Sequence, residues 1–324
     1  MFSGIQPTGD LHLGNYLGAV RNWVALQERH ECFFCIVDLH ALTLPWDPET
    51  LAASRLQAGA LLLACGIDPA RSTLFLQSQV PAHTELAWIL TCVARMGELR
   101  RMVQFKEKSK GETESVGVGL FTYPVLQAAD VLLYRAHGVP VGEDQRQHIE
   151  LMRDLAGRFN QSFGETFVLP DALIPGVGAR VMALDDPTQK MSKSATRPAS
   201  SIQLTDPPDA IRKKFRSAVT DSGSDVRAAP DKPALTNLLG IFSLVAGASV
   251  AELEDRFAGS GYGDFKTALA DAVVAALDPI RTRYEELRAD PAQLSRILEL
   301  GASRAADAAA ATMTDVRRVV GLGA

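Results

Sequence analysis

Short apolar runs alternate with longer helical stretches in the first part of the chain, and this alternation limits the possible folds most strongly. The runs CFFCIVD (32–38) and TLFLQS (73–78) have the length and apolar content of buried strands. Between them, residues 48–65 carry apolar side chains near a 3.6-residue period, directly after Asp47 and Pro48, which are typical of a helix start. A strand, a helix and a strand in this order predict a right-handed crossover and a parallel sheet covered by helices, as in α/β proteins.

Two more strands are predicted further along the chain, at GVPV (138–141) and ARVMAL (179–184), with a helix over 145–159 after the first of them. Ligands of parallel sheets bind beyond the carboxyl ends of the strands. The residues GEDQ (142–145) and those that follow ARVMAL are therefore the expected positions of a binding site.

Beyond about residue 200 the strand pattern stops, and prolines cluster at the transition. Helices are predicted over 206–219, 234–246, 249–256, 264–289 and 292–319. A chain of 324 residues is long enough for two domains with cores of their own. The sequence therefore predicts an α/β domain over 1–200 and an all-helical domain over 201–324.

Composition excludes several classes of protein. The chain has 33 Lys and Arg against 38 Asp and Glu, a net charge of −5, which argues against a globally basic nucleic-acid coat. No membrane span is expected because no run of eighteen apolar residues exists, and the opening MFSGIQPTGD lacks the regions of a signal peptide. The four cysteines are too few and too irregular for a disulfide scaffold, which favours a cytoplasmic protein.

The opening GIQPTGDLHLGNYLG (4–18) is predicted to be a strand end, a turn and a helix start. His12 and Asn15 lie three residues apart, on one face of the first helical turn, and Gly14 between them allows close approach of a backbone. Free N–H groups at a helix start, an imidazole and an amide suit a phosphate group. The alternative is a polar helix cap without a ligand.

KMSKS (190–194) lies between Pro187 and Pro198 and is predicted to be a loop. Lys190 and Lys193 place two ammonium groups on flexible stems, which suits a polyphosphate whose charge shifts during a reaction. The alternative is a solvated basic loop.

The two motifs together resemble the paired signature of the class I aminoacyl-tRNA synthetases. Within that class the chain closely resembles the bacterial tryptophanyl enzymes, nearly from end to end. The matching strings include FSGIQPTG, GIDPARSTLFLQSQVPAH, TYPVLQAADVLLY, VPVGEDQRQHIELMRDLAGRFN, KMSKS, SAVTDS and NLLGIFS. The tyrosyl enzymes share a G-x-D-Q turn, but they do not resemble the GIQPTG opening or the QAADVLLY helix.

The resemblance implies a Rossmann-like nucleotide-binding domain with a helical insertion at about 80–137, followed by an all-α C-terminal domain. The last helix of the C-terminal domain is expected to pack back on the nucleotide-binding domain. It implies that the tryptophan carboxylate attacks the α-phosphate of ATP and that tryptophan then passes to the 3′ end of tRNA(Trp). Mg²⁺ is expected on the ATP phosphates, with no protein metal site. The residues matched to catalysis are His12, Asn15, Lys108, Lys190 and Lys193. Those matched to ATP binding are Gln6, His12, Gly14, Asn15, Gly142, Asp144, Val181, Met182, Lys190, Met191 and Lys193.

An indole ring needs apolar walls and one acceptor for its N–H. Asp130 is the matching acceptor, on a helix predicted over 124–136 among apolar neighbours, where a carboxylate needs a reason to be present. Gln127, on the same face, replaces the methionine of many relatives and is expected to hydrogen-bond Asp130 or to tilt the ring. The residues matched to tryptophan binding are Phe2, His40, Tyr123, Gln127, Asp130, Val139, Val141 and Gln145.

For tRNA the sequence offers basic patches, at 95–110 and in IRKKFR (211–216). The resemblance assigns anticodon reading to the helical domain and implies a homodimer.

Other interpretations remain open: a tyrosyl enzyme, an adenylate-forming paralogue that no longer charges tRNA, and a silent RNA-binding protein. A CFFC metal or redox pair is disfavoured because the three-residue spacing points the thiols of Cys32 and Cys35 to opposite faces of a strand. His148 is expected to be structural, and no P-loop motif is present.

Overall fold

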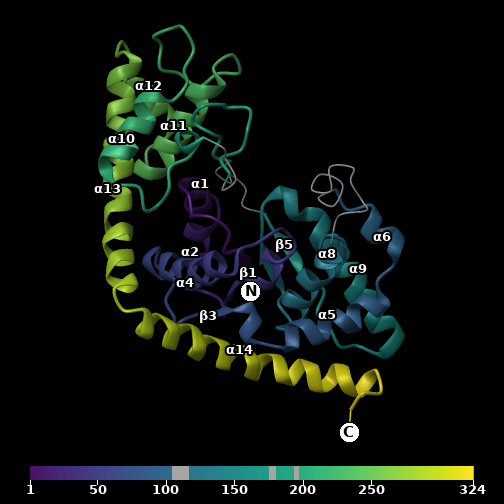
Figure 1. Cartoon of the computed structure of the whole chain (residues 1–324). Helices are drawn as coiled ribbons and strands as arrows, with labels where there is room; N and C mark the ends of the chain where they lie inside the picture. The colour runs from purple at the N-terminus through teal and green to yellow at the C-terminus, as the bar shows by residue number, and fades with distance from the viewer. Residues whose placement is uncertain (104–116, 175–179, 193–196, 324) are drawn as a thin grey trace.

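A computed structural model describes residues 1–103, 117–174, 180–192 and 197–323 (Figure 1). Its centre is a parallel three-stranded sheet in the order β1 (Phe2–Ile5), β2 (Phe33–Ile36), β3 (Thr73–Leu76). The register pairs Phe2 with Phe33 and Phe33 with Thr73. The two strands predicted at 32–38 and 73–78 are therefore confirmed as neighbours in a parallel sheet.

Helices connect these strands. α1 (Leu13–Asn15), the π-helical turn η1 (Tyr16–Val20) and α2 (Arg21–Leu26) follow one another between β1 and β2. α3 (Asp38–Ala41) and α4 (Pro48–Ala64) connect β2 to β3, and Asp47 caps α4 by accepting from Thr50 N at 2.8 Å. The predicted crossover helix over 48–65 is thus confirmed.

A second pair of parallel strands, β4 (Gly138–Pro140) and β5 (Asp171–Leu173), lies beside β1. β4 is joined to β1 by a hydrogen bond from Ser3 Oγ to Pro140 O at 3.3 Å instead of a regular ladder. The segment that leads to β4 contains the 3₁₀ turn η2 (Gln77–Gln79), α5 (Ala82–Val93), α6 (Met96–Arg100) and α8 (Val118–Leu132). The 3₁₀ turn η3 (Glu143–Gln145) and α9 (Arg146–Phe163) connect β4 to β5.

Some predictions for this region were wrong. ARVMAL is not a strand in the part of the chain that the structure describes, although Met182 forms an isolated antiparallel bridge with Lys190. β5 was not predicted. The helix predicted over 124–136 begins six residues earlier, at Val118, and ends at Leu132, with Pro124 inside it.

The sheet separates two hydrophobic clusters. Cys32, Phe34 and Ile36 belong to one cluster, and Phe33 and Cys35 belong to the other. The two thiols therefore lie on opposite faces of β2, as their spacing predicts, and burial raises the pKa of both.

Helices follow the short 3₁₀ turn η4 (Pro198–Ser200). They are α10 (Pro208–Ser217), α11 (Pro233–Ala246), α12 (Val250–Arg256), α13 (Tyr262–Arg288) and α14 (Pro291–Val319). All five predicted helices are confirmed, and no end is displaced by more than two residues. Ser249 and Glu252 form the reciprocal capping box that fixes the start of α12.

The two longest helices tie the molecule together. In Figure 1, α13 runs from the upper helical part down one side of the molecule, and α14 then passes below the sheet. α13 packs on α4, and α14 packs on β3. The approach of α14 is very close at Gly301, where an added Cβ would lie 1.8 Å from Leu74 O.

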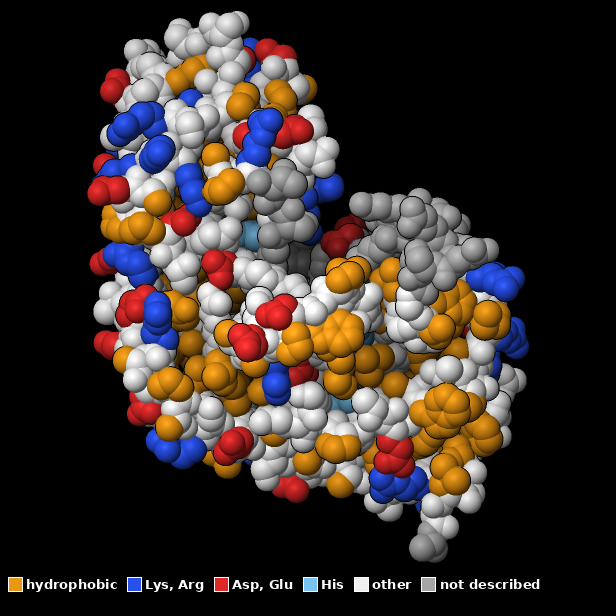
Figure 2. Space-filling view, viewed as in Figure 1, with side chains coloured by type: hydrophobic (Ala, Val, Ile, Leu, Met, Phe, Trp, Pro, Cys, Tyr) orange, Lys and Arg blue, Asp and Glu red, His pale blue; other side chains and the backbone are white. Residues whose placement is uncertain are grey.

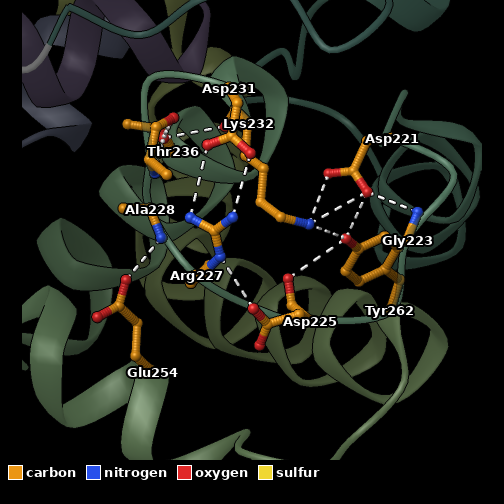
Figure 3. A network of polar contacts seen from close by, with 11 residues as sticks. Asp221, Gly223, Asp225, Arg227, Ala228, Asp231, Lys232, Thr236, Glu254 and Tyr262 are labelled. Carbon is orange, nitrogen blue, oxygen red and sulfur yellow. Dashed lines mark hydrogen bonds and ion pairs between the residues drawn. The ribbon is translucent and has the colours of Figure 1, made fainter.

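A polar network fixes the connection between α10 and α11 (Figure 3). The buried ammonium group of Lys232 lies 3.0 Å from Asp221 Oδ2 and 2.8 Å from the Tyr262 hydroxyl. Arg227 pairs with Asp231 at 3.1 Å. These contacts hold the loop against the starts of α11 and α13.

Within the described residues, no single helix is long and apolar enough to cross a membrane; α11 and α12 pass such a test only together, across a bend of 104°.

Candidate functional site

A cavity of about 360 Å³ opens where β1 and β4 lie side by side. From this position the chain continues to β2 and β3 on one side and to β5 on the other, so the strand order reverses here. Ligands of open α/β sheets bind at such a reversal. All eight residues matched to tryptophan line this cavity: Phe2, His40, Tyr123, Gln127, Asp130, Val139, Val141 and Gln145. Of the residues matched to ATP, Gln6 and Gly142 also line it.

Asp130 is buried on α8, and three side chains donate hydrogen bonds to it. Its Oδ1 accepts from Gln77 Nε2 at 2.6 Å and lies 2.6 Å from His83 Nδ1. Its Oδ2 lies 2.8 Å from His40 Nε2. The carboxylate is therefore held from three elements, α3, η2 and α5.

The same contacts determine the charge of Asp130. Burial alone raises the pKa of this carboxyl, but the hydrogen bonds from His40 and His83 outweigh burial and lower the pKa to about 2. An ionised carboxylate only accepts hydrogen bonds, so both imidazoles donate to it. Its two oxygens offer about four lone-pair positions, of which Gln77, His83 and His40 use three. Among the described residues no further donor is bonded to Oδ2, and Asp130 lines the cavity.

The sequence predicted Asp130 but not two of the residues that hold it. His83 and Gln77 are fully buried, and His83 Nε2 lies 2.8 Å from the hydroxyl of Tyr134. The ring of Tyr134 stacks on Phe2, so the carboxylate is connected to the cavity wall. Gln77 could have been found from the sequence, because it is a polar residue at the end of a predicted strand. A carboxylate on an apolar helix needs hydrogen-bond donors from another element, and Gln77 is such a donor.

The other polar residues of the cavity are also paired. The hydroxyl of Tyr123 lies 2.8 Å from Nε2 of the buried His148, and burial raises the pKa of Tyr123 to about 12. Gln127 Nε2 lies 3.5 Å from Gln145 Oε1. The expected hydrogen bond between Gln127 and Asp130 was therefore wrong, because Gln127 faces Gln145. His148 is buried and holds the hydroxyl of Tyr123, and its structural role stays a prediction.

The residues of the first motif cap each other. His12 Nδ1 accepts from Asn15 N, and Asn15 Oδ1 accepts from His12 N, both at 3.2 Å. This is the polar helix cap that the sequence left open beside the phosphate interpretation. Gly14 lies close to Val181, which pairs with Met191 of the second motif: an added Cβ at Gly14 would be 3.4 Å from Val181 Cβ.

The second motif meets the GEDQ turn. Lys190 Nζ lies 3.7 Å from Asp144 Oδ1, an exposed pair, and the bridge between Met182 and Lys190 places Met191 N 3.0 Å from Val181 O. The structure thus places three parts of the chain close together beside the cavity: Gly14, the segment 181–191 and Asp144. Lys108 and Lys193 lie outside the described residues.

The described part of the chain contains no group of three or more His, Cys, Asp and Glu side chains arranged to hold a metal ion. The basic patch on α10 is partly neutralised. Lys214 pairs with Asp206 at 2.6 Å and Arg212 with Asp271 at 3.0 Å, whereas Lys213 and Arg216 are exposed.

Comparisons with known proteins agree with this geometry. The family model described as tRNA synthetases class I (W and Y) matches residues 1–278. A tryptophan–tRNA ligase from Caldanaerobacter subterraneus subsp. tengcongensis is 53% identical over 323 residues, which cover 99% of this chain and 98% of that protein.

Solved structures agree as well. The tryptophanyl-tRNA synthetase of Mycoplasma pneumoniae has a TM-score of 0.91 at 37% identity, over 99% of this chain and 97% of that one. The enzyme of Campylobacter jejuni, solved with ADP and tryptophan, has a TM-score of 0.86 at 38% identity, over 99% of both chains. The chain therefore belongs to the class I tRNA synthetases for tryptophan and tyrosine, and within them to the tryptophan–tRNA ligases of bacteria.

Proposed function

We infer that this chain activates L-tryptophan with ATP in the cavity beside Asp130 and then transfers tryptophan to the 3′ end of tRNA(Trp). The observation that carries this assignment is the buried, ionised carboxylate with one lone-pair position left for a donor. Apolar walls from Phe2, Val139 and Val141 suit the rest of an indole ring. The indole N–H is thus recognised by the Asp130 carboxylate. A phenyl ring has no donor for this carboxylate.

In the first step a carboxylate oxygen of tryptophan forms a bond to the α-phosphorus of ATP, and the bond from that phosphorus to the leaving pyrophosphate breaks. The reaction needs no side-chain nucleophile. The protein aligns the two reactants and stabilises the charge that develops on pyrophosphate. We propose Tyr123 and Gln145 as contacts of the substrate's ammonium group, since both line the cavity and both carry an oxygen that can accept a hydrogen bond.

We propose that ATP lies between the first helical turn and the segment Val181–Met191. The side of ATP that faces the first helical turn is flanked by His12, Gly14 and Asn15. The adenine is flanked by Val181, Met182 and Met191. The ribose is flanked by Gly142 and Asp144. The proximity of Gly14 to Val181, and of Lys190 to Asp144, supports one shared site. Lys108, Lys190 and Lys193 are proposed to hold the phosphates, with Gln6 facing ATP. Mg²⁺ is proposed to bind through phosphate oxygens, the ligands that this hard cation prefers.

We also propose a division of labour along the chain. Residues 1–200 form the catalytic unit with an insertion at about 80–137, and residues 201–324 form the helical unit that reads the anticodon. The exposed cations Lys213 and Arg216 on α10 are suited to phosphate contacts, which position RNA.

The activity is tested by pyrophosphate exchange into ATP, with tryptophan, tyrosine and phenylalanine run in parallel. Exchange is expected with tryptophan and at least ~10³-fold less with phenylalanine, because a ring without a donor leaves the fourth acceptor position of the Asp130 carboxylate unfilled. Exchange is expected to stop on chelation of Mg²⁺. Charging of tRNA(Trp) then tests the second step and excludes an adenylate-forming paralogue. Exchange with tyrosine alone would contradict the assignment of the cavity.

We propose that the chain is a homodimer whose interface buries exposed apolar side chains of α5, of the start of α8 and of the stretch 42–46: Leu42, Leu44, Trp46, Trp88 and Val118. All five side chains are exposed, Trp88 by 70% and Val118 by 74%. Figure 2 shows hydrophobic side chains gathered over the part of the molecule that contains α5 and α8. The stretch with Leu42 and Trp46 lies beside the start of α8, because an added Cβ at Gly119 would be 4.0 Å from Thr43. Exposed apolar patches of this kind mark interaction sites.

The dimer predicts a specific result in sedimentation equilibrium. The wild-type chain is expected to have twice the monomer mass at micromolar concentration, and Trp88→Glu to have the monomer mass, since a charge in an apolar interface is costly to bury. Leu300→Glu is the matched control, because Leu300 is also exposed, by 56%, but lies on α14. A dimer that survives Trp88→Glu would place the interface elsewhere.

A further inference from the structure

In the segment Val181–Met191, here named the ATP hairpin, the two arms pair with each other beside Met182. Met182 and Lys190 face each other in an antiparallel bridge, closed by Ala183 N to Gln189 O at 2.8 Å and Met191 N to Val181 O at 3.0 Å. In such a pair the N–H and C=O groups of the two facing residues point away from each other. The backbone groups of Met182 therefore need partners on the opposite edge.

Asn237 supplies both partners. Its Oδ1 accepts from Met182 N at 2.9 Å, and its Nδ2 donates to Met182 O at 3.1 Å. A side-chain amide has the same acceptor and donor as a peptide group, so Asn237 takes the place of a neighbouring strand. Asn237 lies on α11, so this contact joins the C-terminal helices to the ATP hairpin.

The helix that carries Asn237 is fixed at its start. Lys232, the residue before α11, has its buried ammonium group 3.0 Å from Asp221 and 2.8 Å from Tyr262, and Figure 3 shows these contacts together. The hydroxyl of Thr236, next to Asn237, donates to Lys232 O at 3.0 Å. The first turns of α11 are therefore held in place, and the amide projects from a fixed support.

A second contact fixes the hairpin further along. Val219 N donates to Leu184 O at 2.8 Å, and Leu184 N donates to Ser200 O at 2.9 Å. Val219 follows α10, so two connections lead from the C-terminal helices to the hairpin. Of these, the Asn237 contact is made by a side chain and can be removed by substitution.

We propose that Asn237 is a positioning residue for ATP, which acts by holding the backbone of Met182 and with it the ATP hairpin. It touches neither substrate nor reacting atoms. The affinity for ATP then depends on the position of α11, whereas the affinity for tryptophan does not, because Asn237 does not line the tryptophan cavity. This inference rests on the proposed function, since it assumes that ATP lies against the hairpin.

The test is Asn237→Asp, which keeps the shape and the acceptor but removes the donor and places a carboxylate oxygen beside Met182 O. The dissociation constant of ATP is expected to rise about 10-fold or more, because the half-buried carbonyl of Met182 loses its partner and meets a negative charge. The dissociation constant of tryptophan, measured without ATP, is expected to stay within about twofold. Both constants are measured by calorimetry, so the result does not depend on turnover.

Asn160→Asp is the matched control. Asn160 also clamps backbone groups, accepting from Phe167 N at 2.9 Å and donating to Phe167 O at 2.8 Å, but it lies on α9. Its substitution is expected to leave both constants unchanged. Asn237→Ala, which introduces no charge, serves as the second variant if the aspartate variant does not fold.

Three results would overturn the inference: an unchanged ATP constant in a folded Asn237 variant, an equal rise in the tryptophan constant, or the same ATP effect in Asn160→Asp. Failure of the proposed function has a different signature. The wild-type chain would then show no tryptophan-dependent exchange, while a selective loss of ATP binding in Asn237→Asp would still support the positioning role.

Discussion

Asp130→Asn is expected to weaken tryptophan binding about 100-fold, or roughly 3 kcal/mol, while the binding of ATP stays near that of the wild type. An amide cannot accept at both ends. Its NH₂ group avoids the Oδ1 position, which faces two donors, Gln77 and His83, and takes the Oδ2 position, which faces only His40. The acceptor reserved for the indole N–H is then lost. Calorimetric titration with tryptophan measures the effect.

Two comparisons separate recognition from stability. Asp38→Asn is the control, because Asp38 is also buried and hydrogen-bonded, by Ser78, but does not line the cavity. It is expected to lower the melting temperature without changing the tryptophan constant. A benzothiophene analogue of tryptophan, which has no N–H, is expected to bind wild type and Asp130→Asn about equally, since neither can pair with it. Normal tryptophan binding by a folded Asp130→Asn would remove Asp130 from the recognition of indole.

Gly301→Ala is expected to destabilise the chain by about 3 kcal/mol or more, the largest effect on stability foreseen for a single added methyl group. The methyl carbon would lie 1.8 Å from Leu74 O and 2.8 Å from Leu74 C, so the helix or the strand must move. Backbone atoms cannot rotate away as a flexible side chain does. The apparent melting temperature is expected to fall by roughly 5 to 10 °C.

Gly157→Ala provides the control for this effect. Gly157 also lies inside a helix, α9, but an added Cβ there meets nothing within 4 Å. Alanine is favoured over glycine inside helices by up to ~1 kcal/mol, so this variant is expected to melt at the same or a higher temperature. Equal destabilisation in both variants would mean that helix propensity, and not the contact with Leu74, governs the result.

The helices could be predicted because their signals are local. α12 and α14 begin beside Ser249 and Asp290, side chains that accept from the first turn, and each helix has a regular apolar period. β5 has three residues, too few to show a pattern. ARVMAL has the composition of a strand, but it finds a side-chain amide, that of Asn237, where a strand of the sheet would pair.

The residues of the candidate site also fall into those that the sequence could predict and those that it could not. Asp130 could be singled out because a carboxylate among apolar helix neighbours is unusual in the sequence itself, whereas the wall residues came from the family resemblance alone. The donors that fix it could not be assigned, because Gln77 and His83 reach it from separate elements that meet only in the folded chain. The mutual cap of His12 and Asn15 likewise depends on the geometry of one helical turn.

The close contact between α14 and β3 also has a consequence for biosynthesis. Leu74 leaves the ribosome long before Gly301, and at about 5 to 20 residues per second the delay is on the order of tens of seconds. During that time β3 has β2 on one edge and α4 against it, but α14 does not yet cover it. Its outer edge then offers unpaired backbone groups to other nascent chains. The part of the chain made first is therefore expected to be more prone to aggregation before α14 is made than after it.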